Sequence, residues 1–119
     1  KMGGQNVALG TDFNGFPGYP SPRFGGEACH GGKGHVQTAR VTYPLSVSVS
    51  KSPSTLGQSK VGDKTFDYNV DGFAHIGLLP DFIEDLRRQG LRNADLDPLM
   101  NSAEAYIRMW ERAEATNVP

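Results

Sequence analysis

The residue with the clearest potential for chemistry is Asp12, which follows the short apolar run Val7–Gly10 by two positions. A carboxylate at the end of a buried strand can ligate a divalent metal ion or take a proton from a bound water. The sequence Asp12-Phe-Asn-Gly15 also has the composition of a turn. The residues alone therefore leave two interpretations open, a catalytic or metal-binding carboxylate and a structural Asx turn or helix cap.

Arg23 is the second candidate, because it lies in the stiffened segment Pro20-Ser-Pro-Arg-Phe-Gly25. A guanidinium held in this way can bind a substrate carboxylate through two parallel hydrogen bonds. A surface ion pair with the nearby Glu27 is an equally good interpretation.

The cysteine and the three histidines show no pattern of a dedicated site. Cys29 and His30 are adjacent, His35 follows a glycine-rich segment, and no third ligand recurs at a metal-binding spacing. The segment Gly31–Gly34 also lacks the form of a phosphate-binding loop. We expect exposed loop histidines here, and we expect His75, with its apolar neighbours, to be buried and bonded to a main-chain carbonyl.

Length and composition limit the classes of protein. The chain has 119 residues, 37% hydrophobic residues and a formal net charge of -1, which suits one small domain and argues against disorder or a nucleic-acid partner. A single cysteine excludes an internal disulfide. No apolar run approaches the roughly 20 residues that cross a bilayer.

The elements that must position these residues are unevenly distributed. Ten of the 15 glycines fall between Gly3 and Gly34, so little regular structure is expected in the first third beyond its opening strand. We predict a last strand of a sheet at residues 1–10 and a long loop with weak strands at residues 11–62. A loop of this length in a compact domain is usually functional.

The middle of the chain predicts a small hairpin. Residues 45–50 alternate between apolar and polar side chains, which indicates a half-exposed strand that Pro44 keeps at an edge. Residues 51–60 are interpreted as a surface connection. Residues 63–79 are expected to hold a strand and a connection, with a strand at Thr65–Val70 as the partner of the first.

Residues 80–115 predict two closing helices. Pro80 and Gly90 mark the start and the stop of the first helix, and the second is expected from about Asn101 to Ala115. Residues 94–98 are expected to form a turn or one short helical turn. In the first helix we expect a buried apolar stripe, with the charged side chains facing water. The stripe of the first helix consists of Leu79, Phe82, Ile83 and Leu86. The stripe of the second helix consists of Tyr106, Met109, Trp110 and Ala113.

These elements cannot cover their own apolar faces. A buried strand such as Val7–Gly10 needs partners on both edges, and two amphipathic helices need a surface to cover. Either the chain oligomerises or it is the C-terminal part of a larger domain. The beginning at Lys1, without an obvious start signal, favours the second interpretation.

Two segments resemble a known family. Gly10-Thr-Asp-Phe-Asn-Gly15 is similar to the Gly-Ser-Asp-Phe-Asp-Gly segment of the membrane (renal) dipeptidases, metal-dependent enzymes of the amidohydrolase superfamily built on a TIM barrel. The segments Tyr68–Arg87 and Ser102–Glu111 resemble the ends of bacterial proteins related to these enzymes. The resemblance implies an α/β fold in which residues 1–119 are an incomplete C-terminal segment of a single (β/α)8 barrel domain.

What the resemblance implies for function centres on Asp12. The corresponding aspartate at the end of the eighth barrel strand ligates metal or takes the proton of the metal-bound water. A divalent metal, zinc in the first instance, as one or two ions, is then expected as cofactor, with its other ligands in the N-terminal remainder of the same barrel. The expected substrate is a small amide or dipeptide-like molecule, bound in part by Arg23. Thr11 and Asn14 depart from the dipeptidase pattern, which leaves the substrate open.

Two alternatives from other classes of protein remain. One is a non-catalytic module that binds a peptide or sugar through the aromatic residues Phe16, Tyr19 and Phe24 of the loop. The other is an assembly segment that docks onto another polypeptide through its apolar helix faces.

Overall fold

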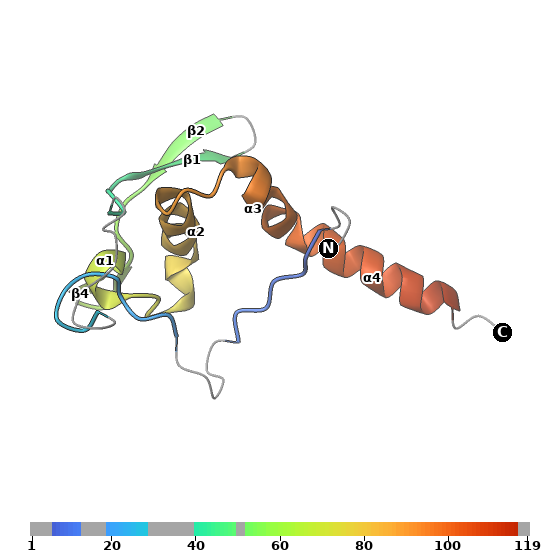
Figure 1. Ribbon diagram of the computed structural model, residues 1–119, viewed down its shortest axis with the longest axis horizontal. Helices are drawn as coiled ribbons and strands as arrows, with labels where there is room; N and C mark the ends of the chain where they lie inside the picture. Colours follow the sequence, from blue (N-terminus) through green and yellow to red (C-terminus); the bar gives the residue numbers. More distant parts are fainter. Residues whose placement is uncertain (1–5, 13–18, 29–39, 50–51, 117–119) are drawn as a thin grey trace. The chain divides into compact units, whose positions relative to one another are not determined.

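The computed structural model describes residues 6–12, 19–28, 40–49 and 52–116 (Figure 1). The contacts divide the chain into two compact units, Asp12–Gly90 and a second unit that joins Lys1–Thr11 to Leu91–Pro119. The expected mixed α/β class is confirmed, with two small antiparallel sheets and several helices. Among the described residues the strands pair only in antiparallel fashion, so the barrel portion stays a prediction.

The first sheet of the larger unit is a hairpin of β1 (Leu45–Val49) and β2 (Ser52–Leu56). The strands pair in antiparallel register, with Leu45 opposite Leu56 and Val49 opposite Ser52. The strand expected at 45–50 is confirmed, but the surface connection expected at 51–60 is wrong, because much of it forms β2. A neighbouring segment closes the shortest loop and therefore loses the least conformational entropy on pairing.

The segment expected to pair with β1 folds differently. β3 (Lys60–Val61) and β4 (Lys64–Thr65) form a second, two-stranded sheet around a turn at Gly62. The chain then enters a short helix, α1 (Tyr68–Asp71), so the strand predicted at 65–70 is wrong beyond Thr65. The Asp67 carboxylate accepts a hydrogen bond from the Asn69 N–H at 2.9 Å. This helix cap outweighs the alternation of apolar residues.

The hydrophobic core of the larger unit joins the hairpin to the helices. Its buried side chains come from β1 and the segment before it, from α1 and the segment after it, and from the end of the 3-10 turn at residues 76–78; they are Val41, Leu45, Tyr68, Phe73 and Leu78. Phe82 packs against this cluster and stacks on Phe73, with ring centroids 5.4 Å apart. Burial of these side chains is the main stabilising contribution to the unit.

Helix α2 (Leu79–Arg88) follows a single 3-10 turn, η2 (Ile76–Leu78). The predicted boundaries are confirmed. Pro80 lies in the first turn, and the Gly90 N–H donates to the Arg87 carbonyl at 2.9 Å, with Gly90 in a left-handed conformation. Glycine adopts this conformation without steric cost, so it ends the helix.

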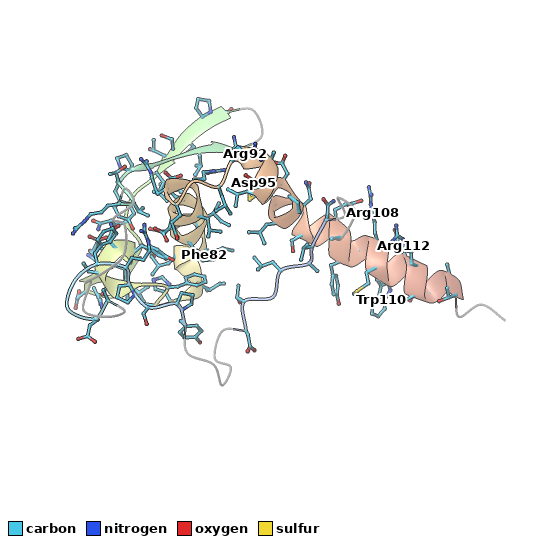
Figure 2. All side chains as sticks on the ribbon, in the orientation of Figure 1. Phe82, Arg92, Asp95, Arg108, Trp110 and Arg112 are labelled. Carbon is cyan, nitrogen blue, oxygen red and sulfur yellow. The ribbon has the colours of Figure 1, made fainter. Side chains whose placement is uncertain are left out.

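The smaller unit contains α3 (Asn93–Met100) and α4 (Ser102–Thr116). The helix predicted from about 101 to 115 is confirmed, and the turn expected at 94–98 is a longer helix of eight residues. Its start is fixed by Asp95, whose carboxylate accepts hydrogen bonds from the Arg92 backbone and side chain at 2.9 and 3.0 Å (Figure 2). Among the described residues, no helix is both long and apolar enough to cross a bilayer.

Residues 6–11 run beside these helices without forming a strand. The Val7 N–H donates to the Pro98 carbonyl at 3.1 Å, and the Leu9 N–H donates to the Ser102 hydroxyl at 2.6 Å. A β-strand is defined by a ladder with a neighbouring strand, and the described residues offer none here. The last barrel strand expected at residues 1–10 therefore stays a prediction.

Among the described glycines, Gly72 should be the one whose replacement is most costly. Its φ of 64° and ψ of -157° suit glycine alone, and a Cβ atom would lie 2.8 Å from the Pro20 oxygen and the Pro22 nitrogen. We expect Gly72→Ala to lower the free energy of unfolding by on the order of 2 kcal/mol or more in urea unfolding. Gly26→Ala is the matched control, because a Cβ atom there meets nothing within 4 Å. Equal effects of the two substitutions would contradict this explanation.

Candidate functional site

Asp12 is exposed and has a positive φ of 50°. Aspartate is among the few residues that tolerate this left-handed conformation, which occurs in turns. No hydrogen bond or ion pair to another described side chain engages its carboxylate. The group is therefore accessible to a ligand, and both the structural turn and the catalytic interpretation remain compatible with its geometry.

The described residues do not make up a metal centre on their own. No group of three or more histidine, cysteine, aspartate or glutamate side chains is placed to hold an ion in the described part of the chain. Zinc is bound by three or four protein ligands. The described residues therefore do not supply a full set of zinc ligands.

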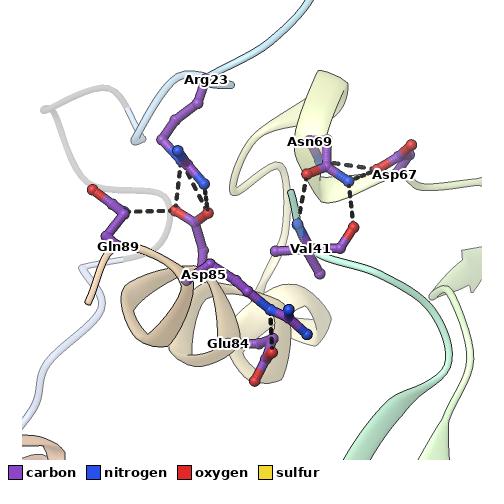
Figure 3. Close-up of polar contacts among 8 residues, drawn as sticks. Arg23, Val41, Asp67, Asn69, Glu84, Asp85 and Gln89 are labelled. Carbon is purple, nitrogen blue, oxygen red and sulfur yellow. Dashed lines mark hydrogen bonds and ion pairs between the residues drawn. The ribbon is translucent and has the colours of Figure 1, made fainter. Parts of the chain in front are cut away.

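Arg23 has a partner inside the chain (Figure 3). Its Nε atom lies 3.0 and 3.1 Å from the two carboxylate oxygens of Asp85 on α2, and its Nη2 atom donates to the same carboxylate. Gln89 donates to Asp85 as well, at 2.9 Å. The Asp85 side chain is 6% exposed and that of Arg23 is 26% exposed. The expected surface pair with Glu27 is therefore replaced by a pair with a buried carboxylate.

The same pair holds the loop 19–28 against the helices. The Phe24 N–H donates to the Asn69 carbonyl and the Phe73 N–H donates to the Pro20 carbonyl, both at 3.2 Å. Ordering a segment rich in glycine and proline costs conformational entropy, which these bonds and the buried ion pair offset. The substrate-binding role of Arg23 stays a prediction, and the geometry gives this guanidinium a structural task.

Two guanidinium groups lie against the ring of Phe24. Phe24 is buried, and the Cζ atoms of Arg23 and Arg40 lie 5.0 and 4.4 Å from its ring centroid. Arginine stacks well on an aromatic face. Because its ring is covered, Phe24 is not available as one of the adhesive aromatic residues proposed for a binding module. Arg40 is exposed, and sequence reasoning did not identify it.

Asn69 acts as a substitute for a strand partner (Figure 3). Its side-chain amide donates to the Val41 carbonyl and accepts from the Val41 N–H, each at 3.0 Å. Asn69 is buried, so both main-chain groups of Val41 are satisfied in the interior. This contact fixes the chain as it enters the hairpin.

Tyr43 and Asp81 form a second buried polar contact. The Tyr43 hydroxyl donates to the Asp81 carboxylate and accepts from the Tyr68 N–H. Burial raises the pKa of the Asp81 carboxyl, and the hydrogen bond from Tyr43 opposes this rise only in part. Burial and the bond to Asp81 also raise the pKa of the Tyr43 phenol.

The two aspartates correct the prediction that the charges of α2 face water. Asp81 and Asp85 are both buried, together with Ile83. They are four residues apart and so lie on one face of the helix, on a side other than the apolar stripe. Two like charges at this spacing are unfavourable on a solvated face. The sequence therefore held a signal for partners elsewhere, although it could not name Tyr43 and Arg23.

His75 differs from its expected role. Its Nδ1 atom accepts a hydrogen bond from the Gly77 N–H at 3.1 Å, so the ring caps η2 and does not donate through this nitrogen to a carbonyl. The ring packs edge-on against Phe66, and its buried Nε2 atom has no hydrogen-bond partner among the described residues. The histidine is partly buried, as an apolar setting predicts. The expectations for Cys29, His30 and His35 fall outside the described residues.

No family model matches the chain, and neither does any curated protein or solved structure. The resemblance to the dipeptidases consequently rests on the segment Gly10–Gly15 alone, and the resemblance to the related bacterial proteins rests on Tyr68–Arg87 and Ser102–Glu111.

The Arg23–Asp85 pair should contribute more to stability than an exposed pair. Arg23→Gln leaves the Asp85 carboxylate buried without its cation, and we expect the free energy of unfolding to fall by about 2–3 kcal/mol. Arg108→Gln is the matched control, because Arg108 pairs with Glu104 on an exposed face of α4. Its effect should stay below about 0.5 kcal/mol. Urea unfolding of both variants measures the difference. If Arg23→Gln lowers the free energy of unfolding no more than Arg108→Gln does, the structural role of Arg23 is contradicted.

The Asp81 carboxyl should make stability depend on pH. Because its pKa in the folded state is raised from 3.8, the fold favours the protonated form, and this stability is lost as pH rises above that value. Asp81→Asn keeps an acceptor for Tyr43 and removes the charge. We therefore expect the stability of the variant relative to the wild type to increase between pH 4 and pH 7. Asp63→Asn, at an exposed turn residue, is the control; a pH-independent difference for Asp81→Asn would contradict the assignment.

Proposed function

We propose that the chain is part of a metal-dependent hydrolase of amide or dipeptide-like bonds, in which Asp12 ligates the metal or accepts a proton from the attacking water. The observation that carries this proposal is the accessible carboxylate of Asp12 in the segment Gly10–Gly15, which resembles the corresponding dipeptidase segment.

The distribution of apolar surface supports the idea that other polypeptide completes the domain. The smaller unit has one buried apolar residue among those described, Leu96. Along α4, three side chains of the stripe that was expected to be covered, Tyr106, Met109 and Trp110, are 54–56% exposed, and the neighbouring Ile107 is 51% exposed (Figure 2 labels Trp110). An exposed apolar stripe of this size marks a surface that another part of a protein covers. The N-terminal remainder of the same barrel is the partner that the proposal assigns to it.

The chemistry assigned to Asp12 is that of a proton acceptor beside a Lewis acid. A divalent metal, zinc in the first instance, would supply a bound water whose pKa is lowered towards about 7. Asp12 would orient this water, take its proton and pass the proton to the leaving amine. A carboxylate is suited to both tasks because its oxygens accept hydrogen bonds and ligate divalent metals.

The alternatives are less well supported. A binding module that grips its ligand with Phe24 would need that ring exposed, and it is buried. An assembly segment accounts for the stripe of α4 but gives no reason for an accessible carboxylate in the segment Gly10–Gly15. The hydrolase accounts for both features.

The test replaces Asp12 in the complete protein that carries this chain. We expect Asp12→Asn to lower kcat for metal-dependent hydrolysis of a dipeptide panel by at least about 100-fold, the typical contribution of a general base. Elemental analysis of bound zinc distinguishes the two roles of Asp12. The zinc content should fall if Asp12 is a ligand, and it should stay the same if Asp12 only accepts a proton.

Asp63→Asn is the matched control, since it removes an exposed aspartate at the turn between β3 and β4. It should retain full turnover. Unchanged turnover in Asp12→Asn, or no metal-dependent hydrolysis of any dipeptide by the wild type, would rule out the proposed function.

A further inference from the structure

The loop that follows Asp12 ends in a fixed aromatic platform. Phe24 is buried, its N–H is bonded to the Asn69 carbonyl, and Arg23 beside it is held by the buried Asp85. The platform, meaning the Phe24 ring with Arg23 on it, is therefore held by a partly buried ion pair and by a backbone hydrogen bond. It belongs to the same compact unit as Asp12.

Arg40 is mounted on this platform. Its guanidinium lies 4.4 Å from the Phe24 ring centroid, and the side chain is exposed. Stacking leaves the N–H groups at the edge of the guanidinium plane free to bind a planar anion, and it restricts the rotamers that such binding would otherwise have to fix. Arg40 is thus a cation held in place before any ligand arrives.

The pairing of the other arginines sets Arg40 apart. Five described arginines contact carboxylates within the chain; these are Arg23, Arg87, Arg88, Arg92 and Arg108. Arg40 and Arg112 contact no carboxylate among the described residues, and of the two only Arg40 stacks on a buried ring. An oriented cation that has no carboxylate partner among the described residues is suited to bind the carboxylate of another molecule.

We propose that Arg40, held on Phe24, binds the terminal carboxylate of a small peptide-like substrate. This inference rests on the proposed function, and it moves the substrate contact from Arg23 to Arg40. Arg23 is committed to Asp85 and cannot leave it without exposing a buried charge to an apolar setting. Arg23 thus holds the platform in place, and Arg40 contacts the ligand.

The test compares two substrates in the complete protein, the dipeptide Ala-Ala and its C-terminal amide. We expect Arg40→Gln to raise KM for Ala-Ala by about tenfold to a hundredfold, the cost of losing hydrogen bonds to a charged group, with kcat little changed. KM for the amide, which has no carboxylate, should hardly change. Arg40→Lys should lie between the two because it keeps the charge and loses the planar fork.

Arg112→Gln is the matched control for removing an exposed positive charge, and it should leave both KM values unchanged. Equal changes of KM for Ala-Ala and for its amide in Arg40→Gln, or no change of either KM, would overturn the role of Arg40. The proposed function would still stand if hydrolysis depended on Asp12.

If the wild type hydrolyses neither substrate, binding is measured directly. The arginine Nε–H nuclear magnetic resonance signal that disappears in Arg40→Gln should then shift with Ala-Ala and not with the amide. If this signal does not shift when Ala-Ala is added, that result alone overturns the inference.

Discussion

The buried carboxylate of Asp85 is the constraint on which the arrangement of the larger unit depends. A charge in the interior is costly unless a partner and hydrogen bonds satisfy it, and Arg23 and Gln89 supply both. Because Arg23 belongs to a loop 62 residues away in sequence, satisfying this one charge brings a segment of irregular structure onto α2. The position of Phe24, and with it that of Arg40, follows from this contact.

The two units differ in how much of their apolar and polar surface is buried and paired within the unit. The larger unit encloses a core between the hairpin and α2. Its buried residues Asn69, Asp81 and Asp85 all have partners, whereas the buried Nε2 atom of His75 has none among the described residues. The smaller unit buries Leu96 and leaves the apolar stripe of α4 in contact with solvent. Hydrophobic burial stabilises a helix in a protein more than its own propensity does. An uncovered stripe on α4 is therefore a reason to look for the surface that it fits.

The expectations that succeeded are those set by local chemistry. Pro80 and Gly90 fixed the bounds of α2, and the alternation after Pro44 fixed β1. The expectations that failed concern pairing. The partner of β1 is the adjacent β2, and α1 replaces the expected partner strand because one capping bond from Asp67 competes with a weak alternation. For the candidate site, Asp12 and Arg23 were identified from the sequence, whereas Asp85 and Arg40 were not.

The sequence by itself determined the bounds of α2 and α4 and the position of β1, because these depend on neighbours within a few residues. Only the tertiary structure decided which charges are buried and which arginine remains open to a ligand. From the sequence alone, Asp85 is an ordinary surface residue of a helix and Arg23 is a candidate for substrate binding or a surface pair. Their shared structural role arises because they meet across the fold. Solvation and pairing are properties of a position in space, so a carboxylate that local pattern places in water can become the anchor of a loop.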